Sequence, residues 1–217
     1  DENDYIWVDH SDEIAPESAM SLCVWFNFEE GGTGNPRILS KDHCDNDGCS
    51  GYELQTLGTG DERLAQLKIG NYEIYADEYN LQSEYWYFVV GTYDEESLRL
   101  FINGELWEHI YIDPPESITT NDNALHIGNR ADNAYDYFKG RIDDIRIYDR
   151  ALSQDEIDEL YCENGYCCTD QNACNWNPNA PMSDNNSCVY EQWWYEDNDG
   201  DGYGHPDLGV EQCNPYN

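Results

Sequence analysis

Three aspartates at alternate positions stand near the carboxy-terminal end of the chain. They are Asp197, Asp199 and Asp201, and Gly202 follows them directly. Carboxylates spaced in this way can converge on one ion, glycine permits the sharp turn that they need, and oxygen is the ligand type that Ca²⁺ prefers. The carbonyl of Tyr203 falls at the next ligand position. The pattern therefore predicts a calcium site in this loop.

The bidentate glutamate that usually closes such a loop is absent, because Leu208 stands at its spacing. Asp207 and Glu211 are the two acids that could complete the shell. Without a cation the segment would be a solvated acidic turn whose three carboxylates repel one another, so a bound ion is favoured. Extracellular sites of this kind have dissociation constants of roughly 10⁻⁴ to 10⁻³ M.

A second acidic loop spans residues 42–48. It contains Asp45 and Asp47, and it lies next to Cys44 and Cys49, which are close enough in sequence to close a tight disulfide loop. Two interpretations of this loop stay open, a second calcium site and a solvated loop.

The charge of the whole chain limits its partners. Its 217 residues include 46 acidic and 10 basic ones, for a net charge of −36. Such a surface repels phosphate groups and anionic lipids, so we expect neither nucleic-acid binding nor docking to a membrane surface. It attracts divalent cations, or it suits a protein that lives in salt. The longest apolar runs, 22–26 and 85–91, are far below the ~18 residues of a membrane span, so no membrane insertion is predicted.

The chain has nine cysteines. In an acidic, loop-rich chain this number favours disulfides and an oxidising compartment over a cytosolic protein. Zinc is the rival interpretation, but the spacings do not form two Cys-x-x-Cys knuckles. Because nine is odd, one thiol is free or pairs with another chain.

The elements that position these residues are predominantly strands. Asn103 and Gly104 stand between two β-type runs and predict a type I′ hairpin turn, since both tolerate positive φ. Short runs without intervening helices indicate an all-β fold, an antiparallel sandwich. The predicted strands are 5–8, 21–28, 37–40, 52–57, 63–69, 72–75, 86–93, 98–102, 106–112, 125–127 and 141–148.

One short helix is predicted after the last of these strands. Ser153 and Glu156 form a capping box, and Ile157 and Leu160 give a short apolar face. The helix should end by Cys162. From there the composition changes, because the remaining sequence is rich in Cys, Asn and Asp and has almost no hydrophobic periodicity. We therefore expect a β-sandwich over 1–161 and a small Cys-rich module over 162–217.

An ordered set of stretches in the first region resembles a known family, the laminin-G-like branch of the concanavalin A-like lectin/glucanase fold. The resemblance implies a jelly-roll of two antiparallel sheets that often carries calcium at its rim and often binds glycans or proteins. It makes Asp143 a candidate rim ligand, with Asp4 as its partner. The stretches are 36–41 (PRILSK), 51–54 (GYEL), 86–94 (WYFVVGTYD), 98–104 (LRLFING), 125–129 (LHIGN), 138–148 (FKGRIDDIRIY) and 150–156 (RALSQDE).

The first region departs from that family in one respect. Members usually open with an apolar strand and an Asp-Gly turn before the segment that corresponds to residues 3–6. Here the chain starts at that turn, so we expect an unpaired sheet edge, which is a liability. Either the strand is removed in processing or another chain supplies it.

The second region resembles two kinds of secreted module. Residues 168–188 (CTDQNACNWNPNAPMSDNNSC) are similar to a repeat of bacterial surface proteins, which implies a Cys168–Cys188 disulfide. Cys174 then needs another partner. Residues 194–204 resemble calcium loops of thrombospondin type 3 repeats, which supports the calcium site above. The candidate partners of Cys174 are Cys162, Cys167 and Cys213.

Catalysis is not predicted. Glucanases of this superfold carry alternating acids on a strand to supply paired carboxylates, whereas the nearest match here, residues 156–159, falls in the predicted helix. We expect a non-catalytic module, extracellular or on a bacterial cell surface, that binds a glycan or a surface protein and is stabilised by calcium and disulfides. The alternative is a structural subunit of a filament or surface layer, a homo-oligomer assembled by strand completion. A glycoside hydrolase is the third and weakest hypothesis.

Overall fold

The computed structural model describes residues 4–30, 34–46, 48–59, 62–130, 137–163, 170–173, 190, 192–195 and 209–212. Contacts within the chain divide it into two units, Asp1–Ser153 and Gln154–Asn217. The division precedes the helix, whereas the sequence places a boundary after residue 161, and that boundary stays a prediction.

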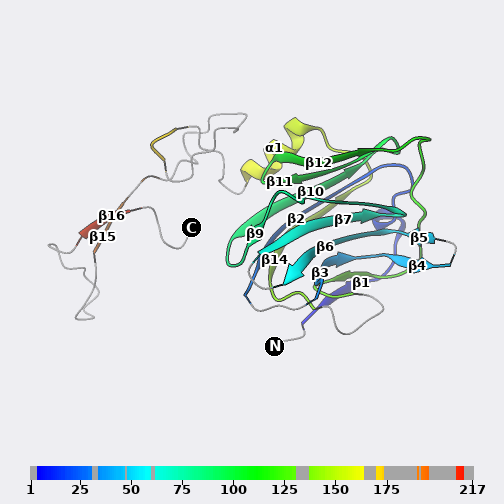
Figure 1. Ribbon diagram of the computed structural model, residues 1–217, viewed down its shortest axis with the longest axis horizontal. Helices are drawn as coiled ribbons and strands as arrows, with labels where there is room; N and C mark the ends of the chain where they lie inside the picture. The colour runs from blue at the N-terminus through cyan, green and yellow to red at the C-terminus, as the bar shows by residue number, and fades with distance from the viewer. Residues whose placement is uncertain are drawn as a thin grey trace. The chain divides into compact units, whose positions relative to one another are not determined.

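The first unit contains a seven-stranded sheet (Figure 1). All of its neighbouring strands are antiparallel, and β9 (Leu81–Gln82) pairs with β7 beside the main path. Along that path the order is β1 (Ile6–Val8), β13 (Leu125–Ile127), β3 (Arg37–Ser40), β6 (Tyr52–Thr59), β7 (Glu62–Ile69) and β8 (Tyr72–Tyr75).

A five-stranded antiparallel sheet forms the other layer. β2 occupies an inner position and all nine of its residues are buried. The turn between β11 and β12 has φ of 52° at Asn103 and 84° at Gly104, which agrees with the predicted I′ hairpin. The order is β12 (Glu105–Tyr111), β11 (Ser97–Ile102), β10 (Trp86–Tyr93), β2 (Met20–Phe28) and β14 (Gly140–Tyr148).

The hydrophobic core lies between the two sheets. β8 lies against β11 and β12, and β7 lies against β10. Gly91 of β10 allows this approach, because a Cβ there would stand only 2.3 Å from Cδ2 of Leu67 on β7. The predicted antiparallel jelly-roll sandwich is confirmed, and its core side chains come from alternate positions of both sheets.

The remaining elements are small. The predicted helix is present as α1 (Gln154–Glu163), one residue longer than expected, and a 3₁₀ turn spans Asp12–Ile14. Two hairpins were not predicted. One joins β4 (His43–Asp45) to β5 (Gly48–Ser50), and the other joins β15 (Gln192–Tyr195) to β16 (Gly209–Gln212). Short polar strands such as β4 lack the apolar alternation from which strands are recognised in a sequence.

Candidate functional site

Strand register assembles a continuous row of side chains on the outer face of the seven-stranded sheet. Residues directly opposite each other on antiparallel strands point to the same face. Following these pairs from β1 to β8 joins six residues that are far apart in sequence. This outer row consists of Trp7, His126, Ser40, Glu53, Lys68 and Glu73.

The neighbouring positions of the same strands form a second row that points the opposite way. With the exception of Ile6, its members are buried or pack against the hydrophobic core. This alternation fixes the orientation of the outer row, because a shift of one residue would expose the core row. The core row consists of Ile6, Ile127, Leu39, Leu54, Leu67 and Ile74.

Exposed aromatic rings gather at the β1 end of the outer row. The ring of Tyr5 lies 5.9 Å from that of Trp7, 6.1 Å from that of His126 and 6.2 Å from that of Tyr137. Trp7 is 58% exposed and Tyr5 is 42% exposed. Nδ1 of His126 lies 3.1 Å from Oδ1 of Asn129, which orients the imidazole. The cluster offers flat apolar surfaces edged by polar groups.

The middle of the outer row is a buried carboxyl group. Glu53 has no exposed side-chain surface, and its Oε2 accepts a hydrogen bond of 2.9 Å from Nε of Arg37. Its Oε1 has no hydrogen-bond partner among the described residues. Desolvation raises the pKa of Glu53, the nearby Asp42 carboxylate adds to this rise, and Arg37 opposes it. The site therefore holds a buried acceptor oxygen that no described residue satisfies.

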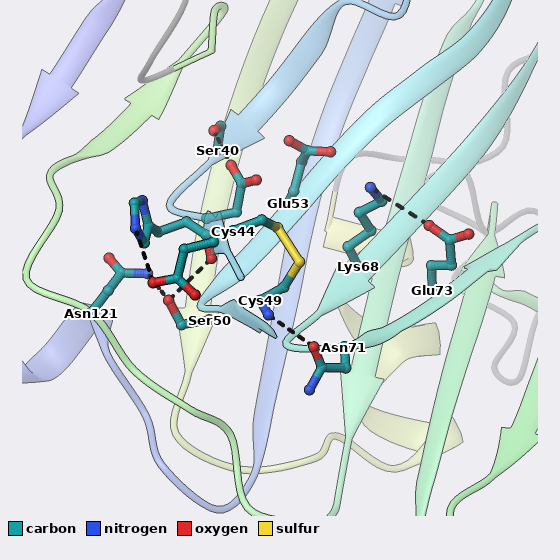
Figure 2. Close-up of a disulfide and its surroundings, with 12 residues drawn as sticks. Ser40, Cys44, Cys49, Ser50, Glu53, Lys68, Asn71, Glu73 and Asn121 are labelled. Carbon is teal, nitrogen blue, oxygen red and sulfur yellow. Dashed lines mark hydrogen bonds and ion pairs between the residues drawn. A yellow bond between two sulfur atoms is a disulfide. The ribbon is translucent and has the colours of Figure 1, made fainter. Parts of the chain in front are cut away.

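Amide and charged groups extend this polar centre toward β8. Gln55 donates to Gln66, whose Nε2 in turn lies 3.4 Å from Oε2 of Glu73. Lys68 forms an ion pair of 3.5 Å with Glu73 (Figure 2). Tyr75, which pairs with Gln66, is 43% exposed and adds an aromatic ring at this edge. Hydrogen-bonding groups thus lie between exposed aromatic rings at both ends.

The β4–β5 hairpin lies beside the outer row. The predicted disulfide between Cys44 and Cys49 closes it, and Figure 2 shows the sulfur bridge next to Glu53 and Lys68. The side-chain Oδ1 of Asn71 accepts a hydrogen bond of 2.8 Å from the backbone N–H of Cys49. These contacts hold the hairpin at the margin of the polar centre.

Gly51 makes the chain reversal after this hairpin possible. Its φ is +76°, and a Cβ there would stand 1.9 Å from the carbonyl oxygen of Lys41. That carbonyl accepts a hydrogen bond of 3.0 Å from Nδ2 of Asn121, which also donates to Ser50 over 3.2 Å. A close backbone crossing therefore fixes where β6, the strand of Glu53, begins.

Some of the predicted calcium ligands can be placed. Asp143 lies in β14, where its Oδ1 accepts from the N–H of Asp144 over 2.8 Å, and Asp45 lies in β4, 3.8 Å from His43. In the described part of the chain, no group of three or more His, Cys, Asp or Glu could hold a metal. Glu211 lies in β16 and Asp4 just before β1, and these sites stay predictions. Six predicted positions fall outside the described residues: Asp47, Asp197, Asp199, Asp201, Tyr203 and Asp207.

The adjacent acids Asp143 and Asp144 do not follow regular strand alternation. The β14–β2 register shifts between Asp143 and Arg146, and Asp144 has a φ of 48°. Regular strand alternation is therefore interrupted at this bulge. Both Asp144 oxygens accept from the Arg146 guanidinium at 2.9 Å, which makes Asp144 a structural residue.

The cysteines beyond the hairpin divide into two groups. Cys23 of β2 is free and buried, and burial raises the pKa of its thiol to about 12. Cys162 is disulfide-bonded. The structure thus shows one free thiol among the described cysteines, which the sequence did not single out. Five predicted disulfide cysteines lie outside the described residues: Cys167, Cys168, Cys174, Cys188 and Cys213.

Sequence reasoning missed the outer row. No sequence pattern indicates a functional role for Trp7, Glu53 or Lys68. A usable signal was present, because Glu53 and Gln55 alternate with Leu54 in one predicted strand. Only the register, however, brings these positions together with residues of β1 and β13.

Comparison with solved structures shows the same fold in several proteins. A protein from Bacteroides ovatus, described as carbohydrate-binding, aligns with 70% of this chain and 43% of its own length, with a TM-score of 0.56 and 18% identity. The binding domain of Paraclostridial Mosquitocidal Protein 1 aligns with 76% of this chain and 42% of its own, with a TM-score of 0.55 and 17% identity. The chain thus spans less than half the length of these two proteins.

A shorter relative in fold is a heptameric pentraxin from Limulus polyphemus, which aligns over 72% of this chain and 81% of its own, with a TM-score of 0.50 and 13% identity. The sequence matches none of the curated proteins. No helix in the described residues is long and apolar enough to cross a membrane. The model of the concanavalin A-like lectin/glucanases superfamily matches residues 1–158, and the chain belongs to this superfamily.

Proposed function

We propose that this protein is a non-catalytic carbohydrate-binding module whose ligand lies along the outer row. The observation that carries the proposal is the row itself, in which exposed aromatic rings stand toward both ends of one sheet face and the partly exposed polar side chains of His126, Lys68 and Glu73 lie on the same face. Sugars present C–H faces that pack on aromatic rings and hydroxyl groups that need donors and acceptors, and sites for such ligands combine apolar surface with a few polar groups.

The charges of the chain favour a particular class of glycan. With 46 acidic residues against 10 basic ones, the surface repels sulfated and uronate-rich polymers. The proposed ligand is therefore a neutral glycan.

Binding is proposed in preference to hydrolysis because the acids of the outer row are already paired. Glycoside hydrolysis needs two carboxyl groups that flank the scissile bond. Glu53 is bonded to Arg37 and Glu73 to Lys68. Each acid therefore has a cationic partner that competes with a substrate for its carboxyl group.

A glycan array tests this proposal. Trp7→Ala should abolish the strongest signals, because it removes the most exposed ring of the aromatic cluster. Trp107→Ala is the matched control, since Trp107 is also exposed but lies on β12 of the other sheet. Equal loss in both variants, or no glycan bound by the unaltered chain, would contradict the proposal.

We also propose that the module is extracellular, that calcium occupies the loop around residues 197–211, and that disulfides stabilise the carboxy-terminal region. The sequence pattern of this loop and the disulfide of Cys162 support this part of the proposal. Removal of calcium with EDTA should increase proteolysis within residues 190–213 before it affects the sandwich. Unchanged resistance in that segment would contradict the calcium site.

A second function is favoured by one observation. Strands β1 and β14 stand at the ends of their sheets, and such edges can pair with strands of other chains. The protein would then be a subunit of a filament or surface layer joined by strand completion. Electron microscopy of native material tests this function, and monodisperse single subunits would contradict it.

A further inference from the structure

His126 stands next to the exposed ring on which the proposed glycan would pack. It pairs directly with Trp7 across the β1–β13 ladder and with Ser40 across the β13–β3 ladder. Side chains directly opposite each other on antiparallel strands have Cβ atoms about 4.5–5.5 Å apart. A sugar ring that packs on Trp7 therefore lies within reach of the imidazole, which is the first polar side chain that it meets along the outer row.

Two neighbours fix the orientation of this imidazole. The interplanar angle between the rings of Tyr5 and His126 is 6°, and their centroids lie 6.1 Å apart. Asn129 is only 5% exposed, and its Oδ1 lies 3.1 Å from Nδ1 of His126. The chain reaches Asn129 through Gly128, which has a φ of +84° and whose N–H donates to the carbonyl of Ile38 over 3.0 Å. The backbone thus holds the amide in place against the imidazole.

The contact with Asn129 determines which nitrogen of His126 carries the proton. An amide oxygen only accepts hydrogen bonds, whereas each nitrogen of a neutral imidazole either donates or accepts. Nδ1 therefore carries the proton and donates to Oδ1 of Asn129. Nε2 is left with a lone pair. It forms no hydrogen bond with any described residue, and it is not among the fully buried atoms that lack one. His126 thus presents an open acceptor at the edge of the aromatic cluster.

We propose that His126 determines the specificity of glycan binding, with its Nε2 accepting a hydrogen bond from a hydroxyl group of the sugar that packs on Trp7. Asn129 is a positioning residue, because it acts through the imidazole. The inference rests on the glycan-binding function proposed above and names the ligand group that is recognised, a free hydroxyl. An O-methyl ether at the same position has no proton to donate, so the site should reject it.

The next two positions of the outer row are less available to this sugar. Oγ of Ser40 already donates to Oδ1 of Asp42 over 2.7 Å, and Oε1 of Glu53 is fully buried. A site that hydrogen-bonds a substrate hydroxyl rejects an analogue without it, because the polar group of the site is then left unpaired. The acceptor of His126 should therefore dominate the selection at this end of the row.

Nitrogen NMR of the 217-residue chain without glycan tests the tautomer. At about pH 8, where histidine is ordinarily neutral, long-range proton–nitrogen spectra distinguish a protonated Nδ1 from a protonated Nε2, and His126→Phe identifies the signals. We expect the proton on Nδ1. Asn129→Asp keeps an acceptor and should preserve this tautomer, whereas Asn129→Ala should lose it. A proton on Nε2 in the unaltered chain would overturn the inference.

Glycan binding tests the recognition. The probes are the glycan with the strongest array signal and its singly O-methylated derivatives. The unaltered chain should bind one derivative about tenfold or more weakly than the parent glycan. His126→Phe keeps an aromatic ring beside Tyr5 and should bind both equally. A steric clash with the methyl group would persist in this variant, so a loss that stays the same in His126→Phe would overturn the inference. Asn129→Asp should keep the discrimination and Asn129→Ala should reduce it.

The outcomes separate this inference from the proposed function. Binding that depends on Trp7 but includes no derivative whose loss depends on His126 would overturn the inference alone. Absence of any bound glycan would overturn the proposed function and the inference with it. His109→Phe is the matched control, since His109 is also half-buried beside an aromatic ring but lies on β12 of the other sheet. It should leave the discrimination unchanged, and an equal effect in both variants would overturn the role of His126.

Discussion

The two faces of the seven-stranded sheet use the same strands for different purposes. The core row places Leu39, Leu54 and Leu67 side by side in complete burial, whereas the outer row, one residue away, places Ser40, Glu53 and Lys68 side by side. Burial alone does not distinguish the faces, because Glu53 is as buried as Leu54. They differ in chemistry, since one face is satisfied by packing and the other has acceptor atoms without a hydrogen-bond partner in the part of the chain that the structure describes.

The largest expected effect is on the core face. Leu54→Ala should lower the free energy of unfolding by about 2–5 kcal/mol, because it removes buried methyl groups and leaves a cavity between β3 and β7. Chemical denaturation measures this loss. A loss below about 1 kcal/mol would mean that the core row does not hold the sheet together.

An intermediate effect is expected at the hairpin beside the outer row. Replacing both Cys44 and Cys49 with serine should destabilise the protein by about 2 kcal/mol, because the bond closes a short loop of sequence separation 5. Hydrogen exchange should accelerate in β4 and β5 first. Acceleration that begins instead in β10 would show that the Cys44–Cys49 disulfide stabilises the whole sandwich and not only the β4–β5 hairpin.

A smaller, pH-dependent effect is expected at Glu53. Its folded-state pKa is raised, so the folded protein holds the proton more tightly than the unfolded chain. This contribution to stability is fully present below the ordinary carboxyl pKa of 4.5 and is lost as the pH rises through the raised value. Glu53→Gln should therefore gain stability relative to the parent as the pH increases through that window. Its magnitude should be of the order of 1 kcal/mol, since glutamine keeps an acceptor for Arg37.

Glu73→Gln is the matched control for this pH profile, because Glu73 belongs to the same row but is 54% exposed at its side chain. Denaturation midpoints across the acidic range should change with pH only in the Glu53 variant relative to the parent. Parallel profiles for all three proteins would contradict a desolvated carboxyl group at the centre of the outer face.

The smallest expected effect is at Cys23. Its buried thiol, with a pKa of about 12, should not react with a thiol reagent in the native protein and should react after denaturation. Non-reducing electrophoresis should show no disulfide-linked dimer. A dimer that disappears in Cys23→Ser would mean that this thiol cross-links two chains.

The fold could be predicted from the sequence because its strands are marked by local patterns. Alternation in residues 52–57 and the Asn103-Gly104 turn each specify structure within a few residues. The outer row could not be predicted in this way, because five successive strand pairings are needed to place Trp7 and Glu73 in the same row. The bulge at Asp144 could not be predicted either, because no glycine marks it in the sequence. The calcium loop of residues 197–211 was predicted from spacing alone and stays a prediction.

Hydroxyl-radical footprinting with the glycan that binds best on the array tests the central claim most directly. The account predicts that bound glycan protects Trp7, Tyr5 and Tyr75 on the outer face of the seven-stranded sheet, and leaves Trp107 and Tyr111 on β12 as reactive as in the free protein. Protection of Trp107 and Tyr111, with Trp7 still fully reactive, would contradict it.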